Sequence, residues 1–193
     1  MILKNEIATV NVFIKDRRAS ALKIDKSFYK DVLNYGDYAS PDDSSLLFVI
    51  DVHLRDREYK IASFADINSW DEKCALLEGQ ILTWLQGFSD IFQLNVATGE
   101  IIGKHEIDSY GPLFGLYRLK DGYVLHGELD IIGLDKDFHQ QWLFSGYDIF
   151  ATRDGKTPFE IKSDRICLYD FLDNYYEIDF EGKTITRDIK CRY

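Results

Sequence analysis

The chain has 193 residues, enough for one domain with a sizeable core, and 46% of its residues are hydrophobic, as in an ordinary globular protein. Its formal net charge of −10 and pI near 4.8 argue against nucleic acid and anionic membranes as partners, because both attract clustered Lys and Arg. The many Ile, Val, Tyr and Phe residues favour strands over helices.

Targeting features are absent from the sequence. The first 18 residues, MILKNEIATVNVFIKDRR, lack the apolar region and cleavage site of a signal peptide. The longest strictly apolar run, Leu46 to Ile50, is too short to span a bilayer. Cys74, Cys167 and Cys191 are odd in number and widely spaced, which indicates reduced thiols rather than a disulfide framework. We therefore expect a cytoplasmic protein.

The N-terminal part predicts strands with irregular connections. Residues 6–15 alternate as a strand does, and residues 21–24 can pair back with them. In residues 26–45, KSFYKDVL allows one or two helical turns and SPDDSS marks an exposed loop. Residues 46–63 predict two strands joined by a turn at Arg55 to Glu58, as a faint copy of the repeat described next.

A short helix is also possible over residues 66–78. Asp66 or Ser69 could cap it, and Trp70, Cys74 and Leu77 would then share one face.

One short phrase occurs three times: GFSDIFQLNVATG at 87–99, GELDIIGLDKDF at 127–138 and DFLDNYYEIDFEG at 170–182. In register, the matching columns include Asp90, Asp130 and Asn174, then Leu94, Leu134 and Ile178, then Asn95, Asp135 and Asp179. The copies are offset by 40 and 44 residues, and a period of ~40 to 45 residues is typical of one four-stranded propeller blade.

The segments around these phrases complete the blade pattern. Four consecutive strands are predicted at 112–119, 123–126, 130–134 and 138–144, separated by tight turns. The next unit repeats the layout at 148–152, 159–162, 165–169, 175–179 and 183–189. We predict an all-β protein of repeated antiparallel four-stranded meanders, in an open or small β-propeller-like stack. It would form one domain, 1–193, with N-terminal strands and a possible short helix in 1–74 and clearer blade-like repeats in 75–193.

IFQLNVATGEII and YYEIDFEGKTI resemble the strand–turn–strand core of quinoprotein-like or WD-like propeller repeats, in which a YxLDxxTGkxxW phrase recurs. The resemblance covers roughly residues 75–190, but only the first copy has the TG turn, and the terminal Trp occurs only as Trp142. A quinone-binding propeller has about eight blades, or roughly 320 residues, so the resemblance implies the fold and no cofactor.

A second, weaker resemblance is to immunity proteins of bacterial polymorphic toxin systems. It rests on the size, the acidity and the style of the strands in WLFSGYDIFATRDGKTPFEI, residues 142–161. This resemblance implies a role in neutralising a toxin domain.

Catalytic and metal-binding motifs are largely lacking. The four histidines have no metal-site spacing, although His126 and Glu128 could share a strand face as a general-base pair. Asp135, Asp137 and His139 alternate as in a calcium loop, but Gly at the sixth position and Glu at the twelfth are missing. No nucleophile elbow, Walker loop or dinucleotide fingerprint occurs. We expect no enzyme activity, no metal and no cofactor.

Carboxylates and aromatic residues gather near the C-terminus. Between 164 and 181 there are six carboxylates against Arg165 alone, interleaved with tyrosines and Phe171. The simpler interpretation is acidic turns around an aromatic core. The functional one is a rim where acids steer a basic partner and aromatic residues anchor it. The predicted partner-binding residues are Trp70, Asp71, Glu72, Asp130, Asp135, Asp137, Asp170, Asp173, Tyr175 and Glu177.

We therefore predict a protein-binding module, and more specifically an immunity or inhibitor protein that occludes the active site of a basic toxin domain. A first alternative is a carboxylate-dependent hydrolase or sugar-binding propeller enzyme, which would need a carboxyl of strongly raised pKa in a pocket. A second alternative is a structural scaffold without a concentrated acidic patch.

Overall fold

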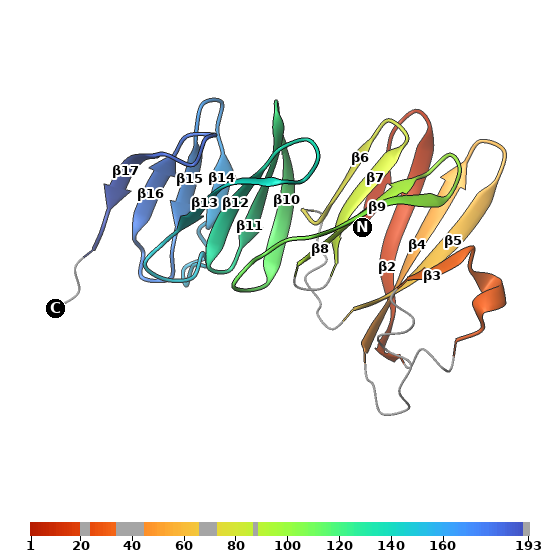
Figure 1. Ribbon diagram of the computed structural model, residues 1–193. Helices are drawn as coiled ribbons and strands as arrows, with labels where there is room; N and C mark the ends of the chain where they lie inside the picture. The colour runs from red at the N-terminus through yellow and green to blue at the C-terminus, as the bar shows by residue number, and fades with distance from the viewer. Residues whose placement is uncertain (20–23, 34–44, 66–72, 87–88, 191–193) are drawn as a thin grey trace. The chain divides into compact units, whose positions relative to one another are not determined.

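The computed structural model describes residues 1–19, 24–33, 45–65, 73–86 and 89–190 (Figure 1). Nearly all of its regular structure is β strand; the one helix among the described residues is a 3-10 turn, Lys26–Phe28. No described helix is long and apolar enough to cross a membrane. The chain divides into two compact units, residues 1–106 (unit 1) and 107–193 (unit 2).

Unit 1 begins with a five-stranded sheet in the order β1-β2-β4-β5-β3. Its strands are β1 (Ile2–Lys4), β2 (Ala8–Ala19), β3 (Asp31–Leu33), β4 (Ser45–Leu54) and β5 (Glu58–Ala65). The predicted strand pair at 46–63 is confirmed as β4 and β5. Its interpretation as a faint blade is wrong, because β3 runs parallel to β5 and β2 pairs with β4 in a mixed sheet.

The predictions for residues 21–45 are met in part. KSFYKDVL forms one 3-10 turn, capped by Asp25, and then strand β3 rather than a second helical turn. Residues 21–23, most of the predicted strand at 21–24, and the loop SPDDSS up to residue 44 lie outside the described residues.

Three four-stranded antiparallel meanders follow, each with its strands in chain order. The first, in unit 1, contains β6 (Ala75–Glu78), β7 (Ile81–Gln86), β8 (Asp90–Asn95) and β9 (Glu100–Glu106). Unit 2 contains β10 (Leu113–Leu119), β11 (Gly122–Gly127), β12 (Asp130–Leu134) and β13 (Gln140–Ser145), then β14 (Phe159–Ile161), β15 (Ile166–Tyr169), β16 (Tyr175–Ile178) and β17 (Thr184–Asp188). The predicted fold class, all-β with repeated four-stranded meanders, is confirmed.

Two local predictions are corrected. The helix proposed over 66–78 is wrong for residues 75–78, which form strand β6, and residues 66–72 lie outside the described residues. The segment 148–152 is not a strand. Its Phe150 N–H donates to the Glu128 carbonyl rather than to a ladder, and the Phe150 ring is fully buried.

The repeated phrase is the third strand of each meander with the turn that follows it. Asn95 is the last residue of such a strand, and Asp135 and Asp179 directly follow one. The side-chain oxygen of each accepts backbone N–H groups from the turn. A short acceptor at this position therefore stabilises the tight connection to the fourth strand. This local requirement explains why the same residue types recur.

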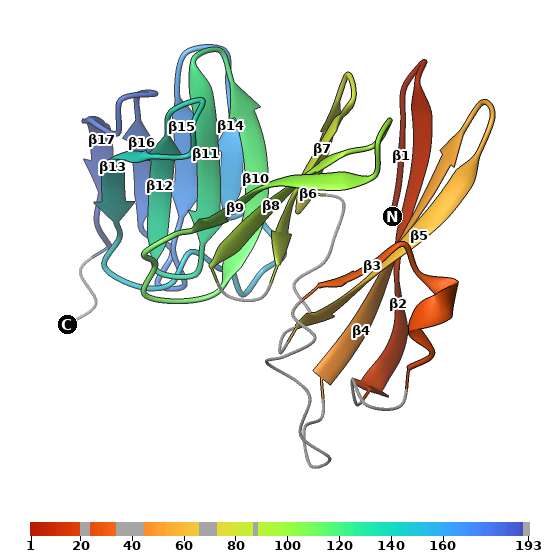
Figure 2. The same cartoon turned by 45° about the vertical axis from the view of Figure 1, so that its right-hand side comes forward.

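Each unit has its own core. In unit 1, Val10, Val12 and Ile50 of the five-stranded sheet belong to one cluster with Trp84 and Leu94 of the β6–β9 meander (Figures 1 and 2). This shared core explains why the β6–β9 meander belongs to the same compact unit as the five-stranded sheet.

In unit 2 the β10–β13 and β14–β17 meanders share a core that includes Ile131, Phe144, Phe150, Leu168 and Tyr176 (Figure 2). Phe144 and Phe150 pack against the Tyr176 ring, with centroid distances of 5.5 and 6.1 Å. The two meanders of unit 2 thus bury one face each against the other.

Candidate protein-binding site

A small hollow with a volume of about 240 Å³ opens in unit 2, where β12 begins and β13 ends. We call it the acidic tyrosine hollow; it is lined by Tyr110, Leu129, Asp130, Ser145, Gly146, Tyr147 and Asp148. Asp130 and Ser145 are directly opposite each other in the β12–β13 pair, so the strand register sets the floor. The loops before β10 and after β13 supply the two tyrosines.

The walls of this hollow are unusually exposed apolar groups. Tyr110 is 80% exposed, Tyr147 is 66% exposed and Leu129 is 38% exposed. Single exposed apolar residues are normal on protein surfaces, but several around one depression are typical of a binding site. Tyrosines are also enriched among the residues that dominate interface energies.

Asp130 lies beneath these groups and is only 4% exposed. Ser145 Oγ donates to Asp130 Oδ1 at 2.5 Å. Asp130 Oδ2 is also buried and has no hydrogen-bond partner among the described residues. A buried carboxylate oxygen without a donor is energetically costly, so this atom is a natural acceptor for a donor that arrives from outside.

A buried polar network supports the hollow from behind. The Tyr147 N–H donates to Tyr176 Oη at 3.0 Å, and Tyr176 Oη donates to Asp170 Oδ2 at 2.6 Å. Burial, and then the hydrogen bond to Asp170, raise the pKa of Tyr176 to about 12. Asp170 is fully buried and also accepts from the Leu172 N–H and from the backbone and side-chain amides of Asn174. Its carboxylate holds the loop together and does not reach the surface.

Two other predicted residues, Tyr175 and Glu177, lie on the face of the β14–β17 meander opposite its core. Tyr175 Oη donates to Glu177 Oε1 at 2.7 Å, and Arg165 Nη1 donates to Glu177 Oε2 at 3.0 Å. The hydrogen bond from Tyr175, and those from Thr186 and Arg165, lower the pKa of Glu177. Burial and its hydrogen bonds to Cys167 and Glu177 raise the pKa of Tyr175. The Glu177 charge is already compensated within this network.

Asp173, half-buried, follows the buried Asp170 turn with a φ of 62°, and Lys156 Nζ lies 3.7 Å from its Oδ1. Like Glu177, it is therefore paired with a cation of its own unit.

Asp135 and Asp137 form a third location, the turn after β12. The ligand atoms of Asp135, Asp137 and His139 lie within 4.8 Å of one another. However, Asp135 Oδ1 accepts from the Asp137 and His139 N–H groups and Oδ2 accepts from Gln141 Nε2. The backbone hydrogen bonds from His139 and then Asp137 lower the pKa of Asp135. The exposed cluster is an ordinary polar turn.

The structure thus distributes the predicted partner-binding residues over several places. Asp130 and Asp170 belong to the hollow and its support, and the others described lie in separate turns and faces. Trp70, Asp71 and Glu72 lie outside the described residues. Four residues of the hollow were not predicted from the sequence: Tyr110, Leu129, Tyr147 and Asp148. The two tyrosines are 37 residues apart in the chain, and no local sequence pattern marks any of the four as part of a site.

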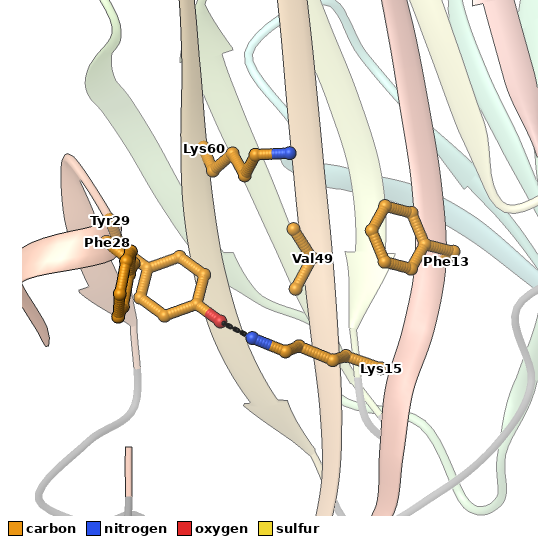
Figure 3. Close-up of a pocket in the computed structure, with 6 residues that line it drawn as sticks. All are labelled: Phe13, Lys15, Phe28, Tyr29, Val49 and Lys60. Atoms are coloured by element: carbon orange, nitrogen blue, oxygen red, sulfur yellow. Dashed lines mark hydrogen bonds between the residues drawn. The ribbon is translucent and has the colours of Figure 1, made fainter. Parts of the chain in front are cut away.

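Unit 1 carries a second hollow of about 250 Å³ on its five-stranded sheet, lined by Phe13, Lys15, Phe28, Tyr29, Val49 and Lys60. We call it the lysine hollow. Figure 3 shows Val49 at its centre, between Phe13 on one side and Phe28 and Tyr29 on the other. Both ammonium groups are already bonded, Lys15 Nζ to Tyr29 Oη at 2.7 Å and Lys60 Nζ to Asp51 Oδ2 at 2.9 Å.

A larger groove of about 920 Å³ runs between the two meanders of unit 2 and is lined by both cationic and anionic side chains around Trp142. Trp142 Nε1 donates to the Phe180 carbonyl at 3.0 Å. The indole lies against the backbones of Gly133 and Gly182, where an added Cβ would come within 2.0 and 2.6 Å of it. Trp142 therefore joins the two sheets of unit 2.

No family model and no curated protein matches the sequence. Among solved structures, the chain is similar to the computationally designed Ika8 protein, with a TM-score of 0.51, 8% identity and coverage of 77% of this chain and 47% of that one. It also matches BamB from Moraxella catarrhalis (TM-score 0.43, 13% identity, 77% and 48% coverage). A third match is Hsv2 from Kluyvelomyces marxianus (TM-score 0.42, 10% identity, 74% and 47% coverage).

The chain spans about half the length of each of these structures. At such low identity the similarity concerns the fold alone. The similarity to Ika8 agrees with the repeated meanders described above.

Proposed function

We propose that this chain is a protein-binding module that captures a basic protein through the acidic tyrosine hollow. In its most specific form the proposal is a neutralising inhibitor, such as an immunity protein that covers the active site of a basic toxin domain. The chain would act in the cytoplasm, without a cofactor and without a catalytic residue of its own.

One observation carries the proposal: three exposed apolar side chains surround a buried carboxylate, one oxygen of which has no hydrogen-bond partner in the part of the chain that the structure describes. Aromatic anchors beside a charge that a partner can satisfy are the usual centre of a tight protein interface. The net charge of −10 adds long-range attraction for a basic partner, which accelerates association at low ionic strength.

The hydrolase alternative receives less support. It requires a carboxyl with a raised pKa in a pocket, whereas every Asp or Glu with a resolved shift among the described residues has a lowered pKa: Asp25, Asp135, Asp154, Asp164 and Glu177. His126 is buried, with Nε2 3.2 Å from the Phe150 carbonyl and its ring stacked on Phe159. It is part of the packing rather than a solvent-facing base.

The test is affinity capture from the cells that make the protein, at low salt, with wild type and Tyr147→Ala side by side. We expect one dominant basic protein in stoichiometric amount with wild type, released by ~0.5 M salt because screening then acts over a few Å. Capture should fall at least tenfold with Tyr147→Ala, the range of a hot-spot residue. Tyr175→Ala is the matched control. Tyr175 lies on the face of the β14–β17 meander that points away from the core of unit 2, so this variant should still bind the partner.

The inhibitor form requires one further measurement. The captured protein should lose its own activity when the wild-type chain is added in equimolar amount. It should keep that activity when the Tyr147→Ala chain is added instead. Equal capture by wild type and Tyr147→Ala would contradict the proposed site. Capture of no basic protein at all would contradict the proposed function.

A further inference from the structure

We infer that the acidic tyrosine hollow receives a single arginine side chain of the partner, with its guanidinium directed at Asp130. This inference rests on the proposed function and deepens it, because it names the group that the site recognises.

The size favours one side chain over a whole ligand. Sites for small molecules and cofactors usually measure ~300 to 1,000 Å³, and this hollow measures about 240 Å³. The hollow is therefore too small for a typical cofactor and suits one long residue inserted from a protein surface.

The carboxylate determines the sign of the ligand. Asp130 Oδ1 already accepts from Ser145 Oγ, whereas Oδ2 has no partner among the described residues. Asp148 adds a second carboxylate to the lining. An incoming group must therefore donate hydrogen bonds and carry positive charge, since a charge-assisted bond to a buried carboxylate is stronger than a neutral one.

The walls favour arginine over lysine. A guanidinium is planar, is less strongly hydrated than an ammonium, stacks on aromatic rings and presents several donors in one plane. Tyr147 already has an arginine next to its ring within the chain: the guanidinium carbon of Arg187, on β17, lies 5.7 Å from the centre of the Tyr147 ring. The same Arg187 also lies over Phe144 and Tyr176, so it belongs to the support of the hollow.

Access to Asp130 requires a small rearrangement. The Oδ2 atom is covered in the free chain, so the entering group must displace a neighbouring side chain. Leu129 and Tyr147 can rotate at little cost because both are substantially exposed, whereas the backbone of Tyr147 is held by its bond to Tyr176. An entering arginine would therefore contact Asp130 at a fixed position, between the adaptable side chains of Leu129 and Tyr147.

The experiment uses the full chain and N-acetyl-arginine methylamide as the probe, followed by amide chemical shifts in a titration. We expect saturable binding, with the largest shifts at Tyr110, Leu129, Ser145 and Tyr147. Asp130→Asn should weaken binding about tenfold, the effect of losing a hydrogen bond to a charged group. The lysine analogue should bind several-fold more weakly than the arginine probe.

Three variants serve as controls. Tyr147→Ala removes a wall without changing the floor, so it tests the site even if Asp130→Asn unfolds the chain. Asp137→Asn removes an exposed carboxylate of the same unit outside the hollow and should leave binding unchanged. Arg187→Gln removes a cation that contacts the Tyr147 ring and should weaken binding slightly, because Arg187 supports this wall of the hollow.

The outcomes separate the inference from the proposed function. Probe binding lost in Asp130→Asn and in Tyr147→Ala supports the inference. No saturable binding, equal binding of the lysine analogue, or shifts located elsewhere would overturn it, even if a basic protein is captured through Tyr147. Probe binding at Asp130 without capture of any basic protein would instead contradict the proposed function and leave the arginine site standing.

Discussion

The two hollows are nearly equal in volume, about 240 and 250 Å³, and both have aromatic walls, but they differ in charge and in what lies beneath. The lysine hollow of unit 1 rests on Val49 of an apolar sheet, and both of its ammonium groups have partners. The acidic tyrosine hollow of unit 2 rests on Asp130, whose Oδ2 atom has no hydrogen-bond partner within the described ranges.

This difference shows why shape alone does not identify a site. A charged group that is already paired gives a ligand little additional energy, since binding must first break the internal bond. An unpartnered buried oxygen offers the full gain of a new hydrogen bond. The acidic tyrosine hollow is therefore the stronger candidate although the two cavities look alike.

The largest expected effect concerns the support of the acidic tyrosine hollow. Asp170→Ala should lower the free energy of unfolding by about 3 to 5 kcal/mol, because four donors in a buried network lose their acceptor. Urea unfolding measures this, with the exposed Asp137→Ala expected within about 0.5 kcal/mol of wild type. A loss below about 1 kcal/mol for Asp170→Ala would mean that unit 2 does not depend on a polar support.

The next prediction compares the loss of stability caused by two glycine substitutions, one where the two sheets of unit 2 pack together and one in an open turn of unit 1. Gly133→Ala places a Cβ 2.0 Å from the Trp142 ring and should cost about 2 to 3 kcal/mol. Gly79→Ala meets open space and costs only the strain of its φ of +56°, about 1 kcal/mol. Equal losses in urea unfolding would show that Trp142 can move aside.

Alkaline pH compares one tyrosine from each unit. Burial raises the pKa of both Tyr59 in unit 1 and Tyr176 in unit 2 to about 12. Because the folded pKa exceeds the usual value near 10, the stabilisation is complete below pH 10 and is lost as the pH rises towards 12. Each tyrosine contributes at most about 1.4 kcal/mol per pH unit to the slope of the unfolding free energy against pH. The contribution of Tyr59 is smaller, because this residue is half-buried and solvent screens the effect.

Tyr59→Phe and Tyr176→Phe should each flatten the decline of stability between pH 10 and 12, and Tyr176→Phe should flatten it more. Denaturant midpoints at several pH values measure the slopes. The exposed Tyr110→Phe is the control, and an unchanged slope in Tyr176→Phe would contradict the buried bond to Asp170.

The smallest expected effects are those of the exposed walls on stability. Lys15→Met in the lysine hollow and Tyr110→Ser in the acidic tyrosine hollow should each change the unfolding free energy by less than about 0.5 kcal/mol, because both side chains are exposed. Thermal unfolding measures both. A large loss in either would mean that its hollow contributes to folding rather than to binding.

The sequence by itself determined most of the strands and turns, but not β6, nor the absence of a strand at 148–152. Short apolar segments separated by turn residues predicted β4 and β5 and all four strands of β10–β13, and the repeated phrase predicted the third strand of each meander. These features follow from interactions between near neighbours, such as the Asx turn that Asp135 or Asp179 forms with its own backbone. Local chemistry of this kind is legible in the order of the residues.

Only the tertiary structure decided which carboxylates face solvent and which residues form one site. Asp130, Asp170 and Asp179 come from similar phrases, yet Asp130 and Asp170 are buried and Asp179 only supports a turn. The tyrosines of the hollow come from loops before β10 and after β13. The physical reason is that burial and pairing depend on which segments pack together, and contacts between distant segments leave no periodic trace in the chain.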